Sequence, residues 1–201
     1  MITTFLRRPH GAELAADALR ILGAVSIVVA GIGWGPLAAL TVSLAVFASL
    51  FPRLLGVRPS VDLAFGVAVL VSAWSSVLEV YLTTRWWDIP THFVTNGLTA
   101  ALLYLLLVRT GVIADAAALR HPFASAVLLT TALGLSLGVL WEVAEWFGHT
   151  YVDETIYVGY SDSIGDLVVG GAGALLAGCT MRFLAGASRF TEGPRQSVAA
   201  R

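Results

Sequence analysis

The chain has 201 residues, of which 57% are hydrophobic and only 12% are charged, and its mean hydropathy is +0.82. Soluble domains carry about 25% charged residues, so this composition excludes an ordinary soluble domain and indicates an integral membrane protein. The single cysteine, Cys179, excludes an internal disulfide and a cysteine-based zinc site.

Six apolar segments predict the membrane spans. The first apolar run, from Ala18 to Phe51, would make a helix roughly 50 Å long, whereas the hydrocarbon core is about 30 Å thick. We therefore expect two helices, with a turn at Gly35 and a new start at Pro36. The expected spans are about 18–34, 37–52, 61–82, from after Pro90 to about Val108, 123–147 and 163–185.

These spans predict an all-α fold, a polytopic bundle of about six transmembrane helices. The bundle forms a single integral membrane domain over 1–201, with short cytoplasmic tails at about 1–17 and 187–201. With both termini inside, eleven arginines fall on the inner side and only Arg85 falls outside. This asymmetry follows the positive-inside rule. It predicts a multi-pass protein with both termini cytoplasmic.

The same topology gathers acidic residues at the outer face, at the ends of spans or in outer loops. These residues are Glu79, Asp88, Glu142, Glu145, Asp153, Glu154, Asp162 and Asp166, and His92 and His149 lie with them. Carboxylates in or beside a bilayer are costly, so they indicate a functional site. Acids that share one pocket repel each other unless protons or a cation compensate. Carboxylate and imidazole ligands suit divalent Zn, Mn, Fe or Mg.

Three short motifs carry the candidate site. Helical spacing places Glu142, Glu145 and His149 on one face of the fifth span. Two further pairs, each four residues apart, stand at the starts of the fourth and sixth spans: Asp88 with His92, and Asp162 with Asp166. These motifs supply six candidate metal ligands: Asp88, His92, Glu142, Glu145, Asp162 and Asp166. We predict that at least four of them line one cavity and bind a metal.

Each motif also has a simpler interpretation. Asp88 and Asp162 could serve as helix caps or first-turn acids. Glu142 and Glu145 could be interfacial carboxylates that face water. We expect His149, Asp153 and Glu154 to be solvated loop residues. Whether Glu79 faces the pocket of the candidate ligands is left open.

At these motifs the chain resembles the YjdF-type family of bacterial inner-membrane proteins and, more distantly, VanZ-like proteins. The resemblance covers about 88–175 and rests on three elements: Asp88 to His92-Phe93, Glu142-Val-Ala-Glu145-Trp146, and Asp162-Ser-Ile-Gly-Asp166 before a small-residue helix. It implies a multi-pass membrane protein of a biochemically uncharacterised family. The VanZ likeness loosely implies a role in the cell envelope.

The leading hypothesis is a metal-dependent enzyme that acts on a lipid-linked or envelope substrate. Its cofactor would be a divalent metal ion of open identity, and Glu142 or Glu145 would act as the catalytic general base. One alternative is a cation- or proton-coupled transporter, and another is a non-catalytic envelope or regulatory membrane protein. Membrane lipids are the expected partners and nucleic acid is not, because no basic patch lies on the outer face. The oligomeric state is left open.

Overall fold

The computed structural model describes residues 5–6, 8–9, 11–154 and 156–186. The predicted all-α fold is confirmed: 82% of the described residues are helical, and none of them forms a strand. The tail expected at 187–201 lies outside the described residues. The elements are α2 (Glu13–Trp34), α3 (Pro36–Ser49), α4 (Phe51–Leu55), α5 (Pro59–Val77), α6 (Val80–Thr83), η1 (Arg85–Trp87), α7 (Asp88–Arg109), η2 (Ala116–Ala118), α8 (Pro122–Tyr151), α9 (Tyr160–Cys179) and α10 (Met181–Leu184).

Six helices are long and apolar enough to cross a membrane, counted over the described part of the chain. They are α2, α5, α7, α8, α9 and the combined stretch of α3 and α4, Pro36–Leu55. The division of the first apolar run is as expected. Gly35 adopts a φ of 92°, which favours glycine, and Pro36 is the first residue of α3.

Several helix ends differ from the sequence-based boundaries. α2 starts at Glu13, inside the stretch expected as a tail. α5 stops at Val77, because the chain turns at Glu79, whose φ of 56° is left-handed and ends the helix. α8 continues to Tyr151, so His149 is helical and not in a loop as expected.

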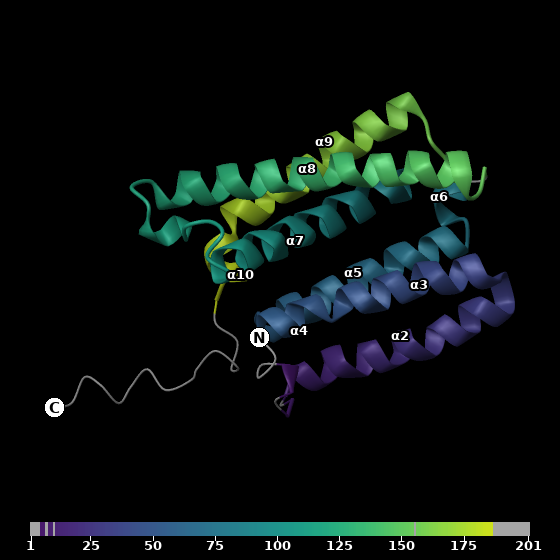
Figure 1. The fold of residues 1–201 in the computed structure, drawn as a ribbon, viewed down its shortest axis with the longest axis horizontal. Coiled ribbons are helices and arrows are strands. Elements are labelled where there is room, and N and C mark those ends of the chain that lie inside the picture. Colours follow the sequence, from purple (N-terminus) through teal and green to yellow (C-terminus); the bar gives the residue numbers. More distant parts are fainter. Residues whose placement is uncertain (1–4, 7, 10, 155, 187–201) are drawn as a thin grey trace.

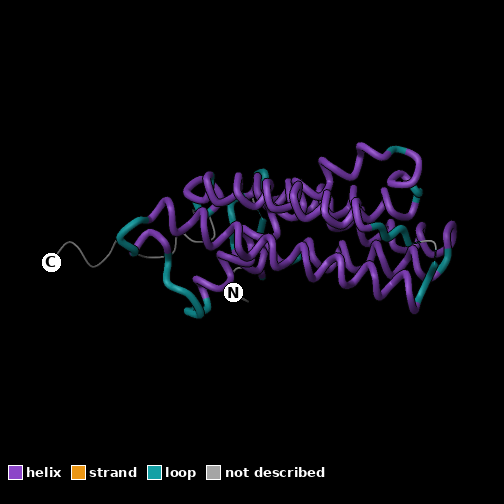
Figure 2. The backbone as a smooth tube through the Cα atoms, turned by 90° about the horizontal axis from the view of Figure 1, so that it is seen from above, coloured by secondary structure: helices purple, strands orange, loops and turns teal. Residues whose placement is uncertain are grey.

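The helices form two groups of three (Figure 1). One group contains α2, α3 and α5, and the other contains α7, α8 and α9. Contacts between α5 and α7 join the two groups. The axes of the long helices lie broadly parallel in the second view (Figure 2). An apolar cluster that includes Phe65, Leu102 and Met181 fills the region where the two groups meet. A second cluster, around Val42 and Leu70, fills the first group.

A buried ionic network holds the first group together at the end where α2 begins. Arg20 donates to the carbonyl oxygen of Ser49 at 2.8 and 3.0 Å, to Asp17 at 2.8 Å, and to Asp62. Arg53 also donates to Asp17. Arg20 and Asp62 stand 42 residues apart. Spacing patterns relate residues within one helix, so they give no signal for an ion pair between residues so far apart in the sequence.

Candidate functional site

Glycines bring α7 and α9 into backbone contact. A methyl group on Gly97 would lie 2.7 Å from the carbonyl oxygen of Gly173, and one on Gly173 would overlap the carbonyl oxygen of Phe93. On the same contact line Asn96 packs against Gly170. One helical turn nearer the start of both helices, His92 and Asp166 face each other. Small residues therefore allow the approach that positions these two side chains.

α8 joins this contact through Asn96. The side-chain amide of Asn96 donates to the carbonyl oxygen of Gly134 on α8 at 3.1 Å. A methyl group on Gly134 would overlap the methyl group of Ala174 on α9, so three helices meet here with little more than the Asn96 side chain and alanine methyl groups between them. Glu142 and Glu145 follow on α8 by two to three helical turns, toward the end at which α7 and α9 begin.

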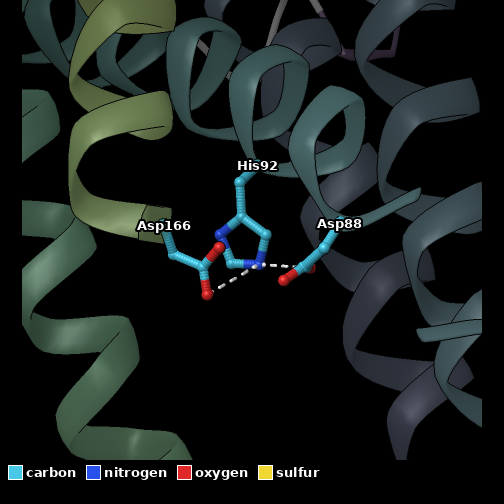
Figure 3. Close-up of side chains that lie close together, drawn as sticks. All are labelled: Asp88, His92 and Asp166. Atoms are coloured by element: carbon cyan, nitrogen blue, oxygen red, sulfur yellow. Dashed lines mark ion pairs between the residues drawn. The ribbon is translucent and has the colours of Figure 1, made fainter. Parts of the chain in front are cut away.

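His92 lies between two aspartates (Figure 3). Its Nε2 is 3.1 Å from Oδ1 of Asp88 and 3.8 Å from Oδ2 of Asp166. The first distance fits a hydrogen bond and the second is too long for one. The Asp166 carboxylate accepts no hydrogen bond from the described residues, although only 9% of this residue is exposed.

Two groups of three side chains have the spacing of metal ligands. Asp88, His92 and Asp166 form the first group, which we call the histidine trio. A second group, the glutamate trio, contains Glu142, Glu145 and Asp166. Within each trio the three ligand atoms lie within 4.8 Å of one another. Asp166 belongs to both trios, so five of the six predicted ligands meet at one place.

The sixth predicted ligand, Asp162, is in neither trio. It lies one turn before Asp166 on α9 and is half-buried. Asp88 and Asp162 are not N-caps, because Trp87 precedes α7 and Gly159 precedes α9, but both are first-turn acids, as the simpler interpretation expected. Glu79 is exposed and lies in neither trio.

The other residues of the acidic stretch lie away from the two trios. Nδ1 of His149 lies 2.6 Å from the carbonyl oxygen of Ile156, so this histidine holds the loop between α8 and α9. Glu154 is exposed in that loop, as expected. Spacing alone placed His149 on the face of Glu142 and Glu145, but its loop contact gives it a separate role.

A groove on the α8–α9 surface lies next to the trios. It has a volume of about 370 Å³ and is open, with a lining that is almost wholly apolar. Its lining residues are Thr131, Leu135, Ile164, Leu167, Val168, Gly171, Ala172 and Leu175. Leu167 packs on Gly138, one turn before Glu142, and it is the chain neighbour of Asp166. The trio residues do not line the groove, and Leu167 and Gly138 connect it along the two helices to Asp166 and Glu142.

The trios combine four carboxylates with one imidazole. Among the side chains that the structure describes, none of the arginines makes an ion pair with these carboxylates, and His92 is their only ionic partner. This chemistry suits a divalent cation with oxygen and nitrogen ligands. Three protein ligands around such an ion leave a position for water or substrate.

These features define a polytopic α-helical membrane protein with a carboxylate–histidine cluster at one end of its second helix group. The chain belongs to the family described as "Predicted membrane protein (DUF2238)", whose model matches residues 18–186. This match confirms the resemblance to the uncharacterised YjdF-type family. No curated protein and no solved structure matches the chain.

Proposed function

We propose that this protein is a bacterial inner-membrane enzyme that uses a divalent metal ion to hydrolyse or otherwise modify a lipid-linked substrate. The observation that carries the proposal is the pair of metal-compatible trios on the same helices as an apolar groove of α8 and α9, whose lining residue Leu167 is the chain neighbour of Asp166. A hydrocarbon chain in this groove would place its polar head at the carboxylates. A purely water-soluble substrate would have no need of the groove.

The ligand set supports the metal part of the proposal. His92 and the four carboxylates of the trios would hold the ion. The distances of 3.1 and 3.8 Å from His92 Nε2 to two carboxylate oxygens are close to the separations of about 3–3.5 Å expected between ligands bonded at about 2.1 Å to one ion. A bound ion polarises the substrate and lowers the pKa of a bound water.

The chain's own carboxylates would move the proton. Glu142 and Glu145 lie on the same face of α8 as Thr131 and Leu135, which line the groove. Either one can accept the proton of an attacking water as general base, provided that it lies within hydrogen-bond reach of that water. Asp88 would be a ligand beside His92, because its carboxylate oxygen lies 3.1 Å from Nε2, the nitrogen that would face the ion.

The arginine distribution supports the proposed orientation. By the positive-inside rule, eleven arginines on one side and one on the other favour cytoplasmic termini, with the trios at the outer, envelope-facing side. A lipid-linked envelope intermediate in the outer leaflet would then reach the groove from the side.

A cation- or proton-coupled transporter is the second candidate, and the interior of the second group disfavours it. Transport needs polar groups from the trios to the opposite end of the helices. The buried residues of α7 between Asn96 and Tyr104 are Gly97, Ala100, Ala101 and Leu102. These four α7 residues are apolar, and among the described residues of α8 the fully buried Thr130 is a polar side chain in this part of the group.

The metal is tested with the purified full chain in detergent. We expect the Tm to rise on addition of Zn²⁺ or Mn²⁺ and to fall on addition of chelator, because a ligand that binds only the folded state stabilises it. Glu142→Gln should lose most of this response, and Glu154→Gln, the same change at an exposed loop carboxylate, should keep it. A parent protein that is indifferent to every metal, and that carries none on isolation, would refute the metal site.

The lipid substrate is tested by filling the groove. Ala172 lines the groove and Leu176, one turn further on, is exposed to the surroundings outside it. Incubation with a total bacterial polar-lipid extract, followed by mass spectrometry, should show a metal-dependent change in one lipid class. Ala172→Phe should reduce this change at least tenfold with metal content intact, whereas Leu176→Phe should not. Equal turnover by both variants would show that the groove does not seat the substrate.

A further inference from the structure

We infer that the site holds two divalent ions, bridged by the Asp166 carboxylate. This inference rests on the proposed metal site and adds its stoichiometry and geometry. The histidine trio would bind one ion and the glutamate trio the other. Asp166 is the one residue that belongs to both.

The placement of Asp166 supports a bridging role. It is nine-tenths buried, with 9% of its surface exposed, and none of the described residues donates a hydrogen bond to its carboxylate. Its nearest ionic contact, His92 Nε2, is 3.8 Å away. Neighbouring carboxylates repel this one, and coordination of an ion by each oxygen would offset that cost.

Charge balance favours two ions over one. The trios contain four carboxylates, Asp88, Glu142, Glu145 and Asp166, and His92 is their only ionic partner among the described side chains. With all four ionised, the site carries four negative charges. One divalent ion would leave two of them uncompensated in surroundings of low dielectric, where like charges repel strongly. Two divalent ions neutralise the site.

The geometry also fits a pair of ions. In two-metal sites the ions lie about 3.5–4 Å apart, a separation that one carboxylate can bridge with its two oxygens. The three ligand atoms of each trio already lie within 4.8 Å of one another, so each trio can close on an ion by side-chain rotation. Each ion would have three protein ligands and open positions for water or substrate.

The test counts ions in the purified full chain. The protein is stripped with chelator, loaded with Mn²⁺ alone, freed of excess metal and analysed for manganese per chain. We expect two ions per parent chain, with an electron paramagnetic resonance spectrum of an exchange-coupled pair in place of the six-line signal of isolated Mn²⁺. His92→Ala and Glu145→Gln each remove a ligand of one trio, and each should retain one uncoupled ion.

Asp166→Asn should weaken binding of both ions at least tenfold, and Glu154→Gln is the matched control with two ions. One ion per parent chain would overturn the dinuclear site and leave the proposed function standing. No ion in the parent chain would overturn both. Two ions without exchange coupling would place them apart and overturn the bridge. The parent protein alone decides among these outcomes, even where a variant fails to fold.

Discussion

The backbone contact between α7 and α9 yields a prediction that links packing to the site. In Gly97→Ala the new methyl group would lie 2.7 Å from the carbonyl oxygen of Gly173 and 2.8 Å from its carbonyl carbon. Ordinary van der Waals contact begins at 3.4 Å, and both obstructing atoms belong to the backbone, so no side chain can rotate away. The helices must therefore separate at this point by about 0.7 Å, the difference between these distances.

The energetic cost follows from this displacement. Overpacking of a close contact costs about 1–3 kcal/mol, and a contact with backbone falls in the upper part of that range. Because His92 stands little more than one turn from Gly97, its distance of 3.8 Å to Asp166 should lengthen by a similar amount. Metal affinity should fall at least about tenfold, as for the loss of a group that orients metal ligands.

The assay is a thermal melt in detergent, with and without Mn²⁺. It compares Gly97→Ala with the parent and with the control variant Gly165→Ala. Gly165 also lies in a helix of the second group, but a methyl group there meets nothing within 4 Å. The control therefore carries the same change in helix propensity without the clash. We expect Gly97→Ala to melt below the parent and Gly165→Ala to melt at or above it. Equal Tm values for the two variants would refute the close-contact argument.

Two further predictions concern the ionic network and the orientation. Arg20→Leu leaves Asp62 buried without its partner and should destabilise the protein by about 3–5 kcal/mol in denaturant unfolding, whereas Arg182→Leu, at an exposed arginine, should not. A loss no larger than that of Arg182→Leu would contradict the structural role of the network. In a chain with Cys179→Ala, a cysteine placed by Glu154→Cys should react with a membrane-impermeant thiol reagent in intact cells, and one placed by Leu119→Cys only after lysis. The reverse pattern would invert the proposed topology.

Hydropathy predicted the helices, and residue spacing selected the candidate site residues. A membrane span has to satisfy its backbone polar groups internally, so an apolar run of sufficient length forms a helix. The turn at Gly35 and Pro36 follows from the conformations that these two residues allow. The intervals between Asp88 and His92, and between Glu142 and Glu145, place each pair on one face of its own helix.

Only the tertiary structure decided which of these faces meet. Spacing treats Asp162 and Asp166 alike, yet Asp166 alone joins both trios, because the backbone contact of Gly97 with Gly173 sets the height and rotation of α9 against α7. Likewise, no local pattern pairs Arg20 with Asp62, since they are neighbours only after α2 packs on α5. Residues within one helix interact at intervals that the helical repeat dictates. Contacts between helices depend on how closely and at what angle the side chains along the whole interface allow them to approach.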